Sequence, residues 1–431
     1  MSECIIAIFL DITLIATILG GMAAAHYYCD KNKYSSWTRW FITLIGIIAT
    51  ICYLGSRYTY PKEFIMLVVI IFTAIPILYG LRRKMMSREI LKTPEMETPE
   101  GQVHPDSKFY VERPPIESEC YEEIVKPAAL IRVKAPRQMG KSSLMTRILK
   151  HAEKNGCHTA NLSFQDADAS VFEDLNKFLQ WFCTAVARES KLSENRAAEC
   201  WEDGLGGKDN CFDFFKSSLL KNTDKPLVLG LDEVDRIFEH KNVAHDFFGL
   251  LRAWHEKGKH DEMWKRLRLV IVHSREVYVP LKIHESPFNV GLAKELPELN
   301  PEQIRDLAER HGLVWNETEL QDVIKMLGGH PYLLRKGMYE LVKKHITFDN
   351  LLKFAPTEQG IYADHLRRHL LNLRKDSDLT KAMKQAVRST APVQIDAIQG
   401  FQLNSMGLVK YQGNDVVPLC DLYRKYFQAR L

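Results

Sequence analysis

The sequence predicts an α/β domain built on a parallel sheet, with an all-helical membrane region before it and a helical domain and a winged-helix domain after it. Three observations support this prediction. Short apolar runs alternate with longer helical patterns between residues 108 and 297, which is typical of parallel sheets. The first 81 residues are far more apolar than the rest. Helix starts, turns and short apolar runs alternate from residue 298 to the end.

The average composition of the 431-residue chain hides a division. Overall, 46% of the residues are hydrophobic and the net charge is +4. Residues 1–81 contain 52 hydrophobic residues (64%) and only 9 of the 112 charged ones, 5 basic and 4 acidic, which leaves +3 for the remaining 350 residues. That small charge excludes a strongly basic nucleic-acid binder. The nine cysteines include no Cys-x-x-Cys pair, so they indicate neither a disulfide framework nor a zinc site.

The apolar front predicts three membrane-spanning helices, at about residues 5–25, 40–54 and 64–81. Basic residues follow the first and third runs and none precedes the first. The positive-inside rule then predicts a multi-pass bacterial inner-membrane protein with a cytosolic body and an outer N-terminus. Asp11, within the first run, either marks an oligomeric contact or pore lining or lies near enough to the interface to stay hydrated. Residues 82–107 contain several prolines among polar residues and predict a flexible cytosolic linker.

A phosphate-binding loop is predicted where the first strand of the body ends. The strand at about 130–133 leads into Ala135-Pro-Arg-Gln-Met-Gly140-Lys141-Ser142-Ser143, and a helical pattern follows. Backbone N–H groups at such a helix start cradle phosphates, while Lys141 reaches the β- and γ-phosphates and Ser142 binds Mg²⁺. The residues predicted from this loop to contact a nucleotide are Arg137, Gln138, Met139, Gly140, Lys141, Ser142 and Ser143.

A second acidic motif follows an apolar strand at 227–231 and completes the predicted chemistry. Asp232 is predicted to hold Mg²⁺, and Glu233 to orient and polarise the attacking water, because phosphoryl transfer depends chiefly on positioning and charge neutralisation. The next strand, 267–272, ends at His273 and Ser274. Either residue could sense the γ-phosphate, or both could be satisfied core groups. The two motifs together predict an ATPase that uses ATP or ADP and Mg²⁺.

The C-terminal part is predicted to contain a helical domain (298–360) and a winged-helix domain (361–431). Asn300 and Asn316 have the spacing of helix caps. After residue 377, two helices, two short strands around a turn and a final helix follow in the order of a winged helix. Its recognition helix, about 394–406, contains no lysine or arginine, which favours packing against protein over binding DNA.

Together these motifs resemble those of STAND-type AAA-like ATPases, and more narrowly a bacterial AAA-like family. The resemblance covers about residues 107–431 and implies a parallel sheet of the AAA-like (ASCE) type. It also implies that Pro331 contacts the nucleotide and that the region around Tyr110 and Arg113 borders the adenine. The segments that carry it are Phe109-Tyr-Val-Glu-Arg113, Gly140-Lys141-Ser142, Leu231-Asp232-Glu233-Val-Asp235 and Gly329-His330-Pro331.

The function expected from this resemblance is a slow nucleotide switch that is closed with ADP and a homo-oligomer with ATP. Because the chain ends after the winged helix, we expect a separate sensor protein as a partner. We further expect the membrane region to be an antiphage effector that disrupts the lipid bilayer. Three alternatives stay open: a membrane-tethered AAA motor, a membrane-bound DNA-binding regulator and a passive anchor. Arginine-finger candidates for the motor are Arg236, Arg252, Arg266 and Arg268.

Overall fold

The structure is a computed structural model that describes residues 96–193, 197–274 and 287–431. The three predicted spans, Asp11 and most of the predicted linker lie outside the described residues. Contacts within the chain divide it after Glu97, and residues 98–431 form one compact unit. Within the described ranges, no helix combines the length and the apolar character that crossing a bilayer requires.

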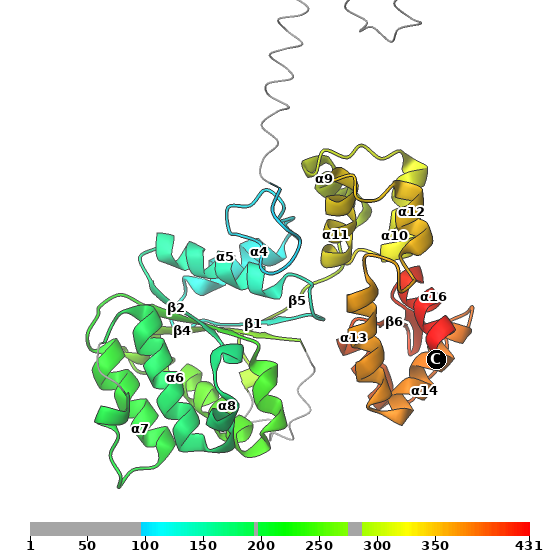
Figure 1. Cartoon of the computed structure of the whole chain (residues 1–431). Helices are drawn as coiled ribbons and strands as arrows, with labels where there is room; N and C mark the ends of the chain where they lie inside the picture. Colours follow the sequence, from blue (N-terminus) through cyan, green and yellow to red (C-terminus); the bar gives the residue numbers. More distant parts are fainter. Residues whose placement is uncertain (1–95, 194–196, 275–286) are drawn as a thin grey trace, which may run out of the picture. The chain divides into compact units, whose positions relative to one another are not determined.

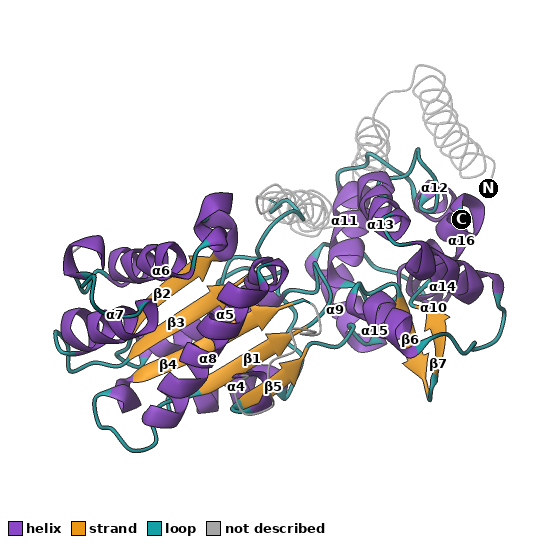
Figure 2. Ribbon diagram, turned by 90° about the horizontal axis from the view of Figure 1, so that it is seen from below, coloured by secondary structure: helices purple, strands orange, loops and turns teal. Residues whose placement is uncertain are grey.

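A five-stranded parallel sheet with the order β2-β3-β4-β1-β5 lies at the centre of the first half of this unit (Figures 1 and 2). The strands are β1 (Leu130–Lys134), β2 (His158–Ser163), β3 (Leu227–Asp232), β4 (Leu267–His273) and β5 (Leu292–Glu295). The sequence predicts the first four. It misses β5 because this short edge strand is only half-buried on alternate residues and contains no apolar run.

Helices cover both faces of the sheet, with α4 and α5 on one face and α6, α7 and α8 on the other (Figure 1). These helices are α4 (Ile116–Ile124), α5 (Lys141–Lys154), α6 (Leu175–Ser190), α7 (Gly207–Phe214) and α8 (Lys241–Lys257). Alternate strand residues serve the two faces. Leu229 packs into the core that contains α6 and α8, whereas Val228 and Val270 pack into the core under α5. Short helical turns complete the connections: η1 (Phe164–Asp166), η2 (Ala169–Glu173), η3 (Ala197–Cys200), η4 (Phe215–Leu220), η5 (Val234–Glu239), η6 (Trp264–Arg266) and η7 (Pro287–Asn289).

The helix after the predicted phosphate loop lies directly over β3. Its apolar face, which includes Met145 and Leu149, is buried as the helical pattern predicts. Gly230, inside β3, allows this close approach, because a Cβ there would lie 2.8 Å from Leu149 Cδ1. The start of α5 and the end of β3 are therefore held next to each other at one edge of the sheet.

The second half of the unit is a helical C-terminal part with a single hydrophobic core. Its elements are α9 (Pro301–Arg310), α10 (Glu317–Leu327), α11 (Pro331–Val342), α12 (Phe348–Phe354), α13 (Ala363–Arg374), α14 (Ser377–Arg388), α15 (Ala397–Ser405), the antiparallel pair β6 (Val409–Gln412) and β7 (Asp415–Pro418), and α16 (Asp421–Arg430). Asn300 and Asn316 form capping boxes, as predicted. The core runs from α9 to α16 without a break at the predicted boundary near residue 360, where Tyr362 donates a hydrogen bond to the Leu333 carbonyl at 2.8 Å.

Candidate functional site

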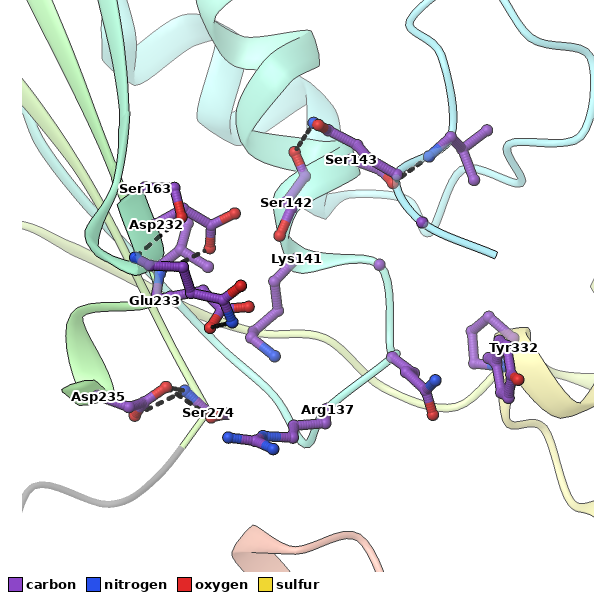
Figure 3. Close-up of a pocket in the computed structure, with 18 of the residues that line it drawn as sticks. Arg137, Lys141, Ser142, Ser143, Ser163, Asp232, Glu233, Asp235, Ser274 and Tyr332 are labelled. Carbon is purple, nitrogen blue, oxygen red and sulfur yellow. Dashed lines mark hydrogen bonds between the residues drawn. The ribbon is translucent and has the colours of Figure 1, made fainter. Parts of the chain in front are cut away.

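A cavity of about 600 Å³ at the carboxyl edge of the sheet brings together most of the predicted site residues (Figure 3). Its volume falls within the range of roughly 300–1,000 Å³ that is usual for ligand pockets. Because the strands are parallel, the residues that follow β1, β3 and β4 meet at this edge. The predicted residues that line the cavity are Arg137, Gln138, Gly140, Lys141, Ser142, Ser143, Asp232, Glu233, Ser274 and Pro331.

The loop between β1 and α5 turns sharply around Gly140. This residue has φ +94°, and a Cβ would lie 3.2 Å from an Arg113 nitrogen, so both conformation and space favour glycine. The Lys141 ammonium donates to the Pro136 carbonyl at 2.8 Å. Burial lowers the pKa of Lys141 to about 8, although the carboxylates of Asp235, Asp232 and Glu233 favour its charged form. One half-buried lysine therefore faces several carboxylates in the cavity.

Asp232 and Ser142 provide the kind of oxygen atoms that Mg²⁺ binds. Burial raises the pKa of Asp232, while hydrogen bonds from the Ser142 hydroxyl and the Glu233 N–H oppose that rise. A hydroxyl beside a carboxylate fits Mg²⁺, which usually takes one or two protein oxygens and completes its shell with phosphate and water. Among the described residues, no group of three or more histidine, cysteine or acidic side chains is arranged to hold a metal ion.

Glu233 is held in a strained conformation by its neighbours. Its φ of +55° lies in the left-handed region, which costs on the order of 1–3 kcal/mol and is common at functional sites. The Gln165 side-chain amide donates to the Glu233 carboxylate. Arg236 in turn donates to the carbonyls of Phe164 at 3.1 Å and Gln165 at 2.8 Å. The turn that follows β2 therefore fixes the direction of the Glu233 carboxylate.

The end of β4 places one of the two suggested γ-phosphate sensors at the cavity. Ser274 lines the cavity, and its backbone N–H and hydroxyl donate to Asp235 Oδ2 at 2.8 and 2.5 Å. His273 is buried outside the lining, with its ring 5.0 Å from that of Phe288. His273 is therefore a residue of the core, whereas Ser274 lines the cavity and is anchored by Asp235.

Three predicted residues do not line the cavity: Met139, Tyr110 and Arg113. The Met139 side chain is buried in the core under α5, and its carbonyl accepts a hydrogen bond from Arg113 at 2.9 Å. Tyr110 donates to Glu117 at 2.8 Å and borders a separate groove of about 740 Å³. Tyr110 and Arg113 therefore lie behind the loop, which Arg113 braces, and neither lines this cavity. Their contact with the adenine stays a prediction.

Sequence reasoning missed several residues that line the cavity. The sequence predicts a linker for the segment 98–107, which we call the strap, but this segment packs against α5 and contributes to the cavity wall. The strap carries no motif, so its sequence offered no signal. The polar residues at the end of β2 could have been inferred, because that end lies at the same sheet edge. The missed residues are Pro99, Gly101, Gln102, Val103, Asn161, Ser163, Gln165, Asp166, Asp235, Val272, Tyr332 and Arg335.

The arginine-finger candidates are occupied within their own chain. Arg236 holds the turn after β2, as described above. Arg252 forms an ion pair with Glu256 at 2.7 Å along α8. Arg266 donates to the Thr223 carbonyl. Arg268 is buried and donates to the Ile124 carbonyl at 2.8 Å, so in this conformation it cannot reach a neighbouring chain.

Buried histidines connect the phosphate loop to the C-terminal part. His365 on α13 forms hydrogen bonds with Gln138 at 2.9 Å and with Tyr423 of α16 at 2.8 Å. Burial lowers the pKa of His330 to about 3, that of His365 to about 2 and that of His369 to about 4. All three rings are therefore neutral near pH 7.

The sheet order and the loop before α5 place the chain among the P-loop nucleoside triphosphatases in fold. The family model of the AAA-like domain matches residues 98–429. The chain belongs to this AAA-like family.

Known proteins resemble parts of the chain. An uncharacterised WD repeat-containing protein of Synechocystis is 24% identical over 325 residues, which cover 68% of this chain and 27% of that protein. The chain thus spans about a quarter of that relative's length. A Walker-type ATPase of Pyrococcus abyssi matches with a TM-score of 0.54 at 15% identity, covering 74% of this chain and 96% of that one. An ORC2 protein of Aeropyrum pernix in its ADP form matches with a TM-score of 0.43 at 14% identity, covering 80% and 98%. At this identity, the match to the Pyrococcus protein supports the fold alone.

Proposed function

We propose that this AAA-like protein binds ATP and ADP together with Mg²⁺ and hydrolyses ATP. The observation that carries the proposal is that Lys141, Ser142, Asp232 and Glu233 line one cavity. These residues come from two motifs about 90 positions apart, and each motif supplies a different part of the chemistry of phosphoryl transfer.

In this proposal, each residue has a defined task. The backbone N–H groups at the start of α5 and the Lys141 ammonium bind the phosphates. Ser142 and Asp232 would hold Mg²⁺, which neutralises phosphate charge when bound. Glu233, held by Gln165, orients the attacking water. Asp235 keeps Ser274 at the cavity wall beside the reacting phosphate.

The test is phosphate release from ATP by the purified full-length chain. Asp232→Asn removes the charge at the predicted metal ligand, so hydrolysis should fall by at least roughly a hundredfold. Asp224→Asn is a matched control, since Asp224 is a fully exposed residue that forms an ion pair with Arg266 at 3.6 Å. Absence of hydrolysis by the natural chain, or equal rates in the Asp232→Asn and control variants, would contradict the proposal.

We also propose that turnover is slow and acts as a switch of the STAND type, with a closed ADP state and a homo-oligomeric ATP state. The hydrogen bond between Gln138 and His365 supports this idea, because a change in the phosphate loop would reach α13 directly. Mass photometry of the chain with ADP and with a non-hydrolysable ATP analogue tests it. The same oligomer in both states would count against the switch.

We interpret the elements from α14 to α16 as a winged helix that packs against protein. Helix α15 contains no lysine or arginine and exposes Ile398 and Phe401, which suits an apolar partner better than phosphate. A separate sensor protein is the proposed partner. Salt-dependent binding of the chain to DNA would instead favour the regulator alternative.

We propose, from the sequence alone, that residues 1–81 anchor the protein in the bacterial inner membrane and act as an antiphage effector. The support is the composition of this region and the acidic residue Asp11 in its first apolar run. Membrane potential during phage challenge, measured for the natural chain and for Asp11→Asn, separates the roles. An unchanged membrane potential with the natural chain would contradict the effector role and leave only the role of an anchor.

A further inference from the structure

The cavity extends beyond the groups that would bind phosphate. Figure 3 shows Tyr332 on the opposite side of Lys141 from Glu233. This second end is walled by the strap, through Pro99 and residues 101–103, and by the first turns of α11, through Pro331, Tyr332 and Arg335. The carboxylates that line the cavity belong instead to the first end, at the carboxyl edge of the sheet.

The strap bridges two elements that are far apart in the sequence. On one side, Gln102 donates to the Ser142 carbonyl at 2.6 Å and the Val103 N–H donates to the Ser143 hydroxyl at 3.0 Å. On the other side, Arg335 donates to the Thr98 carbonyl at 3.3 Å. The strap is therefore fastened both to the first turn of α5, next to the phosphate loop, and to α11.

The chemistry of this end fits a flat heteroaromatic ring better than another phosphate. Tyr332 offers a half-buried aromatic ring, and Pro99 and Val103 offer apolar contacts. Gly101, with φ +77°, brings backbone close to the cavity without a side chain. Arg335 is the cation that lines this end, and its guanidinium already lies over the Phe109 ring and holds Thr98. Lys336 lies beside Tyr332 and donates to its hydroxyl at 3.4 Å. Apolar faces with backbone polar groups at the edge are what a nucleobase requires.

We propose that the strap and the start of α11 form the nucleobase subsite, with Tyr332 as the stacking side chain, and that a bound base fastens the strap between α5 and α11. The proposal rests on the function proposed above. It moves the base away from Tyr110 and Arg113, which lie behind the loop. Because the strap directly follows residues 82–97 in the chain, occupancy of the base subsite would restrain the point where the N-terminal region joins the ATPase.

The experiment compares ADP with inorganic pyrophosphate, which carries the phosphates without the base. Both are titrated by calorimetry, with Mg²⁺, into the full-length chain and its variants. Tyr332→Ala should weaken ADP binding by roughly 5- to 100-fold, the usual effect of removing a stacking ring, and leave pyrophosphate binding unchanged. Tyr332→Phe should bind ADP nearly as the natural chain does. Tyr339→Ala, on the same helix but outside the cavity, should change neither affinity.

Hydrogen exchange of the strap provides a second readout. ADP should slow amide exchange in residues 98–103, and pyrophosphate should slow it much less. Three results would overturn the subsite while leaving the proposed ATPase intact. The first is an equal loss of ADP and pyrophosphate affinity in Tyr332→Ala, and the second is no loss for either ligand. The third is equal protection of the strap by both ligands. A natural chain that binds neither ligand would instead contradict the proposed function, and the subsite with it.

Discussion

The two ends of the cavity differ in how the chain builds them. The first end, which we call the phosphate end because we propose that the phosphates bind there, consists of residues that directly follow β1, β3 and β4, so the sheet alone brings them together. The opposite end combines the strap with α11, whose contact between Thr98 and Arg335 spans 237 positions. The carboxylates that line the cavity lie at the first end, whereas the second end offers the Tyr332 ring, apolar side chains and the Arg335 guanidinium. The charged residues of the first end lie in short motifs that local sequence patterns predict, whereas the second end is assembled from distant segments and is recognised only in the structure.

The largest expected effect comes from Lys141→Ala at the phosphate end. This change removes the half-buried cation that faces Asp232 and Asp235 and leaves the carboxylates to repel the phosphates. Binding of both ADP and pyrophosphate should become undetectable by calorimetry. Lys154→Ala, at the exposed end of the same helix, should bind both ligands normally. Retained ADP binding by Lys141→Ala would contradict the assignment of the phosphates to the end of the cavity that contains Lys141.

Glu233→Gln should separate binding from hydrolysis. The amide keeps the shape of the side chain but cannot act as a base, so turnover should fall by roughly 10²- to 10⁴-fold while ATP still binds. Stopped assays of phosphate release, together with nucleotide titration, measure both quantities. Glu239→Gln, an exposed residue at the end of η5, is the control. Turnover that survives the Glu233 change would remove this residue from the mechanism.

Arg113→Met tests whether the loop is braced from behind. The change leaves the Met139 carbonyl without its donor, which should lower the free energy of unfolding by about 1–3 kcal/mol. Because the loop serves the phosphates, ADP and pyrophosphate should lose affinity to the same extent, unlike in Tyr332→Ala. Denaturant unfolding and calorimetry test this, with Arg305→Met, exposed on α9, as the control. A selective loss of ADP binding would instead indicate that Arg113 contacts the base.

The smallest expected effect is proton uptake when a nucleotide binds. The pKa of Lys141 in the free protein is about 8, below its ordinary value of 10.5, so part of this group is neutral at pH 8.5. Phosphates favour the charged form, so binding should raise the pKa and take up a fraction of a proton. Calorimetry in two buffers of different ionisation enthalpy measures this uptake, which should disappear in Lys141→Arg. Proton release at pH 8.5 would contradict the assigned contact.

Local sequence predicts which residues gather at the phosphate end for a physical reason. A helix start with Gly140 and Lys141, and an apolar strand that ends in Asp232, are each determined by neighbouring residues, and parallel strands bring such ends together. The predicted strands and helix caps agree with the structure because alternation and capping are local as well.

The rest of the site depends on contacts that local patterns do not encode. The polar composition of residues 98–107 predicts a linker, but hydrogen bonds to Ser142 and Ser143 hold them on α5. The hydrogen bond from the Tyr110 hydroxyl to Glu117, seven positions along the chain, has no counterpart in the local patterns either. The edge strand β5 is too short and too exposed to produce an apolar run. Tertiary contacts therefore determine these features: hydrogen bonds to α5 for the strap and pairing with β1 for β5.

The most direct test is an experimental structure of the full-length chain with ADP and Mg²⁺ bound. The account predicts the diphosphate against the start of α5, beside Lys141 and Ser142, with the base against Tyr332 and the strap. Phosphates bound away from Lys141, or a base bound beside Tyr110, would contradict the assignment of the two ends.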